Sequence, residues 1–270
     1  MGVTPARRPV MLVTGASAGL GAALARAYAA RGWDLVLTAR REAPLRALAE
    51  QLTHHDAVSL VIPEDLADPD APRRLIAAVN AAGLRLDGLV NNAGFSRTSG
   101  FLRTSMDQHA EMLQVMLRAP VELSRLAAPG MVERGFGRIL NVASLAGEMP
   151  ATGGDTLYGP IKSFLIKASL GLHLELRAAG VHVTVLCPGY TLTEFHDVNG
   201  SRAQVSSAYP SWMWQTAEDV ARVGYLACDA NRPKVVPGAM NNVLAGLGRL
   251  LPERLALRMI RDHARRLERL

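Results

Sequence analysis

This 270-residue chain has few cysteines and lacks long apolar runs, and each of these features excludes a class of protein. Two cysteines, Cys187 and Cys228, cannot form a disulfide framework, and their apolar surroundings favour buried thiols in a reducing compartment. No apolar run approaches the roughly 20 residues that a membrane-spanning helix needs. The segment from Met1 to Pro9 lacks the apolar core of a secretion signal. We therefore expect a cytoplasmic protein.

Lysine is the other scarce residue, with three lysines against 27 arginines. The formal net charge is +6, but the sequence has no long basic run and the arginines are spread along it. A preference for arginine over lysine, or a need to bind small anions, accounts for this charge without nucleic acid. His196 has no metal-ligand spacing to other histidines, so we also expect no metal site.

Short aliphatic or β-branched runs alternate with helical stretches, which is typical of an α/β protein with a parallel sheet. Gly32, Gly83 and Gly180 are placed to end helices before the next strand. The predicted strands are Val10–Thr14, Asp34–Thr38, Val58–Pro63, Gly88–Asn91, Arg138–Ala143, Val181–Cys187 and Lys234–Val236. This order predicts a Rossmann-type, doubly wound, seven-stranded parallel sheet with helices on both faces. With no linker or repeat, we expect residues 1–270 to form a single domain.

A glycine-rich turn, Thr14–Gly21, follows the first strand and enters an alanine-rich helix over Ala22–Arg31. In a βα unit, such glycines allow a tight turn and close approach of the backbone to a pyrophosphate at the helix N-terminus. A purely structural turn is the alternative, because a glycine pattern alone is weakly specific. The predicted cofactor contacts of this turn are Gly15, Ser17, Gly19, Leu20 and Gly21.

The end of the second strand indicates which dinucleotide binds. Enzymes for NAD usually have a carboxylate here that accepts from the ribose 2′-hydroxyl, whereas this chain has Arg40 and Arg41. Two arginines at the start of a helix oppose its dipole, but guanidinium groups suit a 2′-phosphate. The pair predicts NADP(H) in preference to NAD(H), with a solvated surface pair as the alternative.

Tyr158 and Lys162 are four residues apart at the start of a predicted helix and therefore share one face, with Pro160 in the first turn. A free phenol has a pKa of about 10, and a nearby ammonium together with the positive ring of an oxidised nicotinamide lowers it. Tyr158 could then give its proton to a carbonyl oxygen while a hydride reaches the carbon. Ser144, at the carboxyl end of the fifth strand, could polarise the same oxygen, although a turn serine is an equally good reading.

Taken together, these motifs resemble the short-chain dehydrogenase/reductase family over nearly the whole chain. Thr14–Gly21 matches its TGxxxGxG turn, Asn91–Gly94 matches its NNAG, and Ser144 with Tyr158-x-x-x-Lys162 matches its catalytic signature. The resemblance implies that Lys162 also holds the nicotinamide ribose and that a homodimer or homotetramer forms. It further implies cofactor contacts by Asp65, Leu66, Asn92, Ala93, Gly94, Tyr158, Lys162, Pro188, Gly189, Thr191 and Thr193.

One position departs from the family pattern. Members usually carry an asparagine, within a pattern like MLxVN, that helps to hold a water linking the lysine to solvent. This chain has Met116 there, and a thioether cannot replace an amide as a hydrogen-bonding group. Met116 is either a core residue, with protons arriving by another route, or the sign of a slowed or altered catalyst.

The predicted substrate-covering segment, residues 190–214, follows the sixth strand and is interrupted at Asn199–Ser201, as in a mobile lid. It holds five of the 13 aromatic residues: Tyr190, Phe195, Tyr209, Trp212 and Trp214. Aromatics in a covering segment favour an apolar or ring-containing substrate, although they could simply pack the segment onto the core.

The C-terminal tail, residues 238–270, is predicted to be helical. Leu247, Leu251, Leu255 and Met259 recur at four-residue spacing, and arginines from Arg258 onwards load its end with positive charge. Packing on the body or on a partner subunit is the favoured interpretation, and peripheral contact with an anionic membrane is the alternative.

The sequence thus predicts an NADP(H)-dependent carbonyl reductase, or the reverse alcohol dehydrogenase, for a medium-sized apolar small molecule. The Tyr-x-x-x-Lys spacing excludes the enoyl-reductase branch of the family, and the chain length and glycine pattern exclude the epimerase and dehydratase branch. The rival hypothesis is a non-catalytic dinucleotide-binding regulator or scaffold, which Met116 motivates.

Overall fold

The computed structural model describes residues 7–97, 99–193 and 213–266. Its centre is a parallel sheet with the strand order β3-β2-β1-β4-β5-β6-β9. The strands are β1 (Val10–Thr14), β2 (Asp34–Thr38), β3 (Ser59–Val61), β4 (Gly88–Asn91), β5 (Gly137–Val142), β6 (Val181–Leu186) and β9 (Lys234–Val235). The chain crosses over between β3 and β4, and this reversal of strand order is where ligands bind in doubly wound sheets. The predicted Rossmann-type fold is confirmed.

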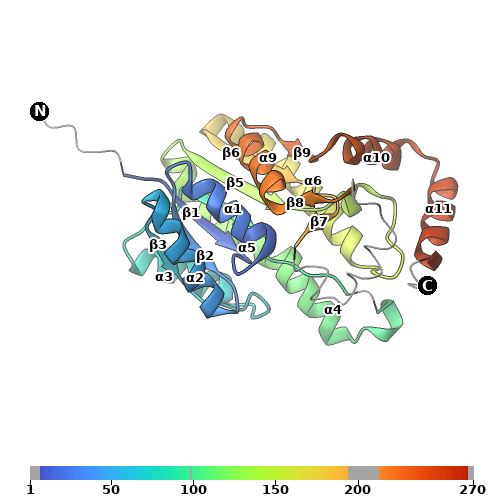
Figure 1. Cartoon of the computed structure of the whole chain (residues 1–270), viewed down its shortest axis with the longest axis horizontal. Coiled ribbons are helices and arrows are strands. Elements are labelled where there is room, and N and C mark those ends of the chain that lie inside the picture. The colour runs from blue at the N-terminus through green and yellow to red at the C-terminus, as the bar shows by residue number, and fades with distance from the viewer. Residues whose placement is uncertain (1–6, 98, 194–212, 267–270) are drawn as a thin grey trace, which may run out of the picture.

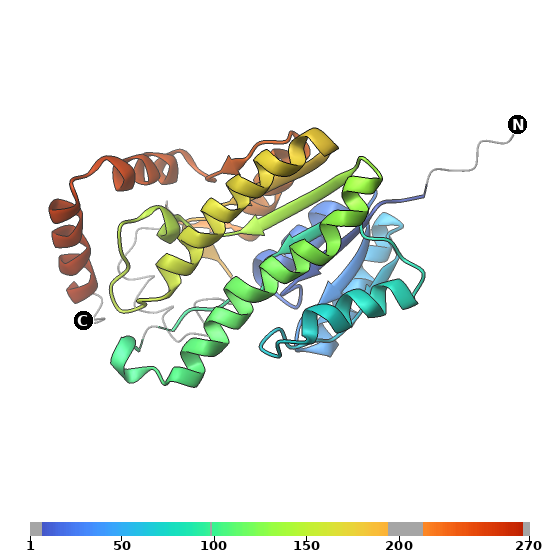
Figure 2. The same ribbon diagram turned by 180° about the vertical axis from the view of Figure 1, so that it is seen from behind.

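Helices cover both faces of the sheet (Figures 1 and 2). One face carries α1 (Gly19–Ala29), α2 (Glu42–Leu52) and α9 (Ala217–Asp229), and the other carries α3 (Ala71–Ala81), α5 (Ala119–Glu133) and α6 (Tyr158–Leu176). β1 shows why: Met11 and Val13 pack into the core under α1, whereas Val10 and Leu12 pack into the core under α5. A strand buried on both faces must be apolar throughout, as this one is.

Glycines end the helices where the sequence predicts. Gly32, Gly83 and Gly180 have φ values of 84°, 71° and 75°, a left-handed conformation that lets the chain leave a helix and enter a strand. The predicted strand Val58–Pro63 is too long, because β3 spans only Ser59–Val61. Val58 is 71% exposed, and its N–H donates to Asp34 rather than to the sheet ladder.

A second, two-stranded parallel sheet pairs β7 (Thr191–Leu192) with β8 (Gln215–Thr216). The sequence does not predict it. It brings together the two ends of the predicted substrate-covering segment, most of which, residues 194–212, lies outside the described residues. The expected lid behaviour of residues 190–214 and the roles of its aromatics at 195, 209 and 212 therefore stay predictions.

The tail contains two helices, α10 (Ala239–Leu250) and α11 (Glu253–Arg266), beyond the carboxyl ends of the strands (Figure 1). α10 packs on the body: Ala245 is buried with Leu165 and Cys187. In contrast, Leu247 and Leu255, two leucines of the predicted four-residue repeat, are each 47% exposed. None of the described helices is long and apolar enough to cross a membrane.

Candidate functional site

The three predicted catalytic residues meet where β5 ends and α6 begins. Ser144 lies two residues beyond β5, and Tyr158 is the first residue of α6. Lys162 follows one turn later, with its Nζ 5.6 Å from the centre of the Tyr158 ring. A hydrogen bond joins Ser144 to Tyr158. A hydroxyl, a phenol and an ammonium therefore converge at the carboxyl edge of the sheet.

Lys162 is almost fully buried, with 5% of its surface exposed. Its Nζ donates a hydrogen bond of 2.9 Å to the carbonyl oxygen of Val142, which fixes the side chain under the end of β5. Burial lowers the pKa of Lys162 to about 8, because removal from water disfavours the charged form. Lys162 therefore changes charge close to the physiological range.

Tyr158 differs from the sequence-based expectation of a lowered pKa. Burial raises its pKa well above the usual value near 10, the hydrogen bond with Ser144 partly opposes this, and the charge of Asp155 adds to it. Withdrawal from water is the largest of these effects in the protein alone. Tyr158 consequently keeps its proton across the neutral range, as a proton donor must.

The loop that carries Ser144 is anchored on both sides. It continues into a 3₁₀ turn, η4 (Leu145–Glu148), whose first N–H donates to the carbonyl of Pro188 over 2.8 Å. At its other end, Glu148 is 5% exposed and forms an ion pair of 2.8 Å with Lys234. Between them, Gly147 lies directly against the backbone of α6, where a Cβ would come within 2.7 Å of the Lys162 carbonyl carbon. These contacts therefore fix the position of Ser144 relative to α6.

A buried hydrogen-bond chain connects the strands to the helices behind the site. Asn91 Nδ2 donates to Asn141 Oδ1 over 2.8 Å and to Ser124 of α5 over 3.2 Å. Asn141 Nδ2 in turn donates to Ser169 of α6 over 2.8 Å. Because buried polar groups are costly when unpaired, these contacts fix α5 and α6 relative to β4 and β5.

The glycine-rich turn has the shape that a dinucleotide needs. Gly15 and Gly19 have φ values of 65° and 54°, and a Cβ on Gly21 would collide with the carbonyl of Gly15. The hydroxyl of Thr14 accepts from the N–H groups of both Asn92 and Ala93, at 2.9 and 3.0 Å. The turn and the NNAG segment are therefore joined, and the glycines leave backbone exposed where a pyrophosphate would approach the N-terminus of α1.

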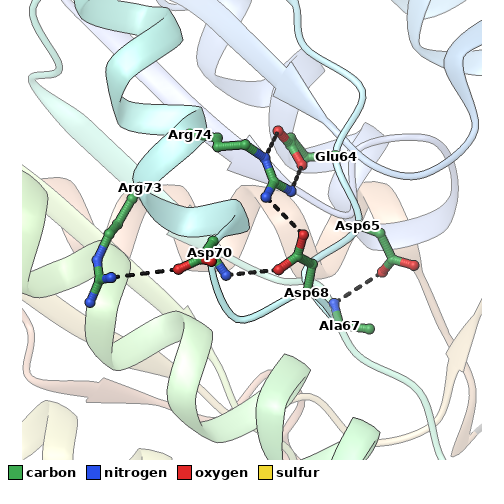
Figure 3. A network of polar contacts seen from close by, with 7 residues as sticks. All are labelled: Glu64, Asp65, Ala67, Asp68, Asp70, Arg73 and Arg74. Carbon is green, nitrogen blue, oxygen red and sulfur yellow. Dashed lines mark hydrogen bonds and ion pairs between the residues drawn. The ribbon is translucent and has the colours of Figure 1, made fainter.

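The two predicted arginines flank the adenosine end of this surface. Arg41 is the N-cap residue of α2, and its guanidinium lies 3.4 Å from the Ser17 hydroxyl in the glycine-rich turn. Arg40 lines a cavity of about 290 Å³ together with Asp65. The Asp65 carboxylate accepts from the N–H of Ala67 over 3.0 Å (Figure 3). The structure thus brings Arg40 and Asp65, 25 residues apart in sequence, to one cavity, and Leu66 beside them is buried.

The predicted nicotinamide loop, residues 188–193, is fixed from three sides. Thr191 Oγ1 donates to the Gly189 carbonyl over 3.1 Å, and Thr193 contacts Gly19 of the glycine-rich turn. Gly189 also lies against Asn241 of α10, whose Nδ2 would be 2.5 Å from a Cβ at position 189. Asn241 Nδ2 donates to Gln215 Oε1 over 3.1 Å. The tail is therefore part of the frame of this loop.

Met116 is 1% exposed and lies in the middle of a five-residue π-turn, Gln114–Arg118, between α4 (Met106–Leu113) and α5. Both the Met116 Sδ and the Lys162 Nζ lie close to Gly94. π-turns interrupt the regular helix and are frequent at functional sites. The packing of Met116 among Met112, Val115 and Ile161 supports the interpretation as a core residue.

Two residues that shape the site are absent from the sequence-based prediction: Arg74 and Asn241. A signal existed for Arg74, because an arginine in the first turn of a helix opposes the dipole, as at Arg40 and Arg41. Asn241 is a buried amide in an apolar tail helix, which is also a signal. In the described part of the chain, no group of three or more His, Cys, Asp or Glu side chains could hold a metal ion.

Comparison with known proteins places this geometry in a family. Residues 9–204 match the family model described as short chain dehydrogenase. Sulfoacetaldehyde reductase 2 of Chromohalobacter salexigens is 33% identical over 239 residues, covering 84% of this chain and 94% of the relative. The NADP-dependent 3-hydroxy acid dehydrogenase YdfG of Escherichia coli is 32% identical over 216 residues, covering 78% and 86%.

Among solved structures, a short-chain dehydrogenase from Sphingobium yanoikuyae in complex with NADPH superimposes with a TM-score of 0.76 at 29% identity. The match covers 90% of this chain and 96% of that one. The chain therefore belongs to the short-chain dehydrogenase/reductase family of oxidoreductases.

Proposed function

We propose that this protein is an NADPH-dependent carbonyl reductase that converts a ketone or aldehyde to an alcohol. The observation that carries the proposal is the convergence of Ser144, Tyr158 and Lys162 beside the glycine-rich turn. The rival hypothesis, a non-catalytic dinucleotide-binding protein, needs no such convergence.

The cofactor of the proposal is NADP(H) in preference to NAD(H). Arg41 beside Ser17 and Arg40 in the cavity with Asp65 are positioned to hold a 2′-phosphate, and no carboxylate occupies the end of β2. Two of the similar proteins described above are named as NADP-dependent or were solved with NADPH. Lys162 would hold the nicotinamide ribose, and Thr193, at the end of the loop over Gly19, would hold the carboxamide.

The mechanism assigns one task to each side chain. When bound, NADPH supplies the hydride that the carbonyl carbon accepts. Ser144 donates a hydrogen bond to the carbonyl oxygen and so stabilises the negative charge that develops there. Tyr158 gives its proton to the same oxygen, and its raised pKa keeps that proton available at neutral pH. The ammonium of Lys162, 5.6 Å from the ring, stabilises the phenolate that remains.

For the substrate we propose a medium-sized apolar carbonyl compound. Tyr190 and Trp214, at the two ends of residues 190–214, lie with ring centroids 5.5 Å apart and give this segment an apolar base. A second candidate is a small anionic aldehyde or hydroxy acid, because the relatives named above are a sulfoacetaldehyde reductase and a 3-hydroxy acid dehydrogenase.

Three further parts of the proposal concern the setting of the protein. A cytoplasmic location is consistent with the burial of both cysteines. A homodimer or homotetramer follows from the family alone. Membrane contact through the tail stays a prediction, motivated by the exposed Leu250 and the basic end of α11.

A carbonyl panel tests the proposal, with NADPH consumption followed by absorbance. The panel pairs apolar ketones and aldehydes with sulfoacetaldehyde and short 3-oxo acids. Turnover of the apolar compounds supports the first substrate class, and turnover of only the anions replaces it with the second. Tyr158→Phe should abolish turnover with little loss of affinity for NADPH. NADPH binding by the wild type without turnover of any carbonyl would favour the non-catalytic rival.

A further inference from the structure

Arg74, in the first turn of α3, holds two carboxylates of the loop that follows β3 (Figure 3). Its Nε and Nη2 lie 3.1 and 2.8 Å from the two oxygens of Glu64, and its Nη1 lies 2.7 Å from Asp68. The two carboxylates raise the pKa of Arg74, and hydrogen bonds from the Asp70 N–H and from Arg74 lower the pKa of Asp68. The helix dipole disfavours an arginine at this position, so its reason lies in these partners.

The two residues that Arg74 holds lie on either side of the predicted adenosine contact, Asp65, in the sequence. Glu64 precedes Asp65 directly, and Asp68 follows three residues later. The N–H of Glu64 donates to the carbonyl of Ala39 over 3.2 Å, which ties this loop to the residue before Arg40. One guanidinium therefore steadies the two loops that carry Arg40 and Asp65.

The charges around the cavity explain why the ion pairs of Arg74 affect the binding of the phosphorylated cofactor. The cavity of about 290 Å³ is lined by three carboxylates, Glu64, Asp65 and Asp68, and by two guanidiniums, Arg40 and Arg74. A 2′-phosphate that enters near Arg40 meets those carboxylates as like charges. Without Arg74, Glu64 and Asp68 would each lose this ion pair, and Asp68 would keep the hydrogen bond from the Asp70 N–H. Their negative charges would then be uncompensated beside the phosphate.

We propose that Arg74 determines the preference for NADPH over NADH, as a positioning residue that holds Glu64 and Asp68 away from the 2′-phosphate. The inference rests on the proposed use of NADPH. NADH lacks the phosphate and therefore meets no such repulsion, so Arg74 contributes to its binding only through the position of the loop.

The test measures binding directly. NADPH and NADH are titrated into the purified full-length protein, and the dissociation constants are taken from cofactor fluorescence at low and at high salt. Arg74→Gln is expected to weaken NADPH binding about tenfold and NADH binding about twofold, with the NADPH effect shrinking at high salt.

The adjacent Arg73 provides a matched control. It lies on the same helical turn, is 65% exposed, and pairs with Asp70 and Glu122 rather than with the cavity. Arg73→Gln removes the same charge and should change both dissociation constants by less than twofold. If Arg73→Gln weakens NADPH as much as Arg74→Gln does, net charge alone is responsible and the inference is wrong.

Two further variants separate charge from folding. Arg74→Lys keeps the charge and should retain most of the NADPH preference even if Arg74→Gln unfolds. The double variant Arg74→Gln with Glu64→Gln has the wild-type cavity charge and should recover the preference to within about threefold. Equal weakening of NADPH and NADH in Arg74→Gln, or no recovery in the double variant, would overturn the role of Arg74. Failure of the wild type to bind NADPH would overturn the proposed cofactor instead.

Discussion

Replacing Lys162 by methionine should stabilise the protein while it removes activity. Burial lowers the pKa of Lys162 from 10.5 to about 8, so holding the ammonium in the folded state at pH 7 costs about 3 kcal/mol, at about 1.4 kcal/mol per tenfold change in proton affinity. Methionine has a similar length and no charge. It loses the hydrogen bond to the Val142 carbonyl, which contributes about 1–2 kcal/mol. The net expectation at pH 7 is a gain of about 1–2 kcal/mol in the free energy of unfolding.

The pH dependence identifies the cause of this gain. Below pH 8 the lysine is charged in both the folded and the unfolded state, and the full penalty is present. As the pH rises above 8, the folded protein loses the proton first, so the unfolded state binds more protons and wild-type stability rises until about pH 10.5. Between pH 7 and pH 9.5 the advantage of Lys162→Met should therefore shrink by about 2 kcal/mol and nearly vanish.

Urea unfolding of both proteins at pH 7 and pH 9.5, at one protein concentration, gives these values. Lys167 on the same helix is exposed, so Lys167→Met should change stability by less than about 0.5 kcal/mol at both pH values. A Lys162→Met variant that is no more stable at pH 7, or whose advantage is the same at pH 9.5, would refute the account of the buried charge.

Of three other predictions, two concern the frame of the site and one concerns the opposite, amino edge of the sheet. Met116→Leu should leave kcat within about twofold of wild type, because both side chains fill the same core space; a large loss in steady-state assays would show that the thioether takes part in proton supply. Gly189→Ala should raise the dissociation constant for NADPH several-fold, because the new Cβ meets Asn241, and adding Asn241→Ala should restore most of the affinity in the same titration. Asp87→Ala should lower the free energy of unfolding in urea by about 2–4 kcal/mol, because the buried carboxylate accepts from the N–H of Val10 and pairs with two arginines; a change below 1 kcal/mol would contradict this.

The fold could be predicted from the sequence because its signals are local. Each central strand is an apolar run bounded by turn residues, and glycines at positions 32, 83 and 180 mark where helices end. The pairing of β7 with β8 could not be predicted in the same way. Each strand has two residues, and the 22 residues between them carry no signal for their register.

In the candidate site, too, local relationships could be predicted from the sequence and long-range contacts could not. Tyr158 and Lys162 are neighbours on one helix, so their spacing predicts their proximity. In contrast, the burial that raises the pKa of Tyr158 in the protein alone depends on how α6 packs, and the residue spacing does not predict it. Likewise, Arg74 and Glu64 are ten residues apart in different elements, and only the fold brings them into contact.

The docking of α10 has a practical consequence for protein engineering. Its residues contact Gly189 and, through Gly248, the end of the turn that carries Ser144. A segment attached to the end of α11 would therefore extend a tail that is docked beside the candidate site, whereas β1 begins at the opposite, amino end of the sheet (Figure 1). For the same reason, exchanging the tail between relatives would change the support of the Gly189 loop and of the turn after Ser144 while it leaves the central sheet untouched.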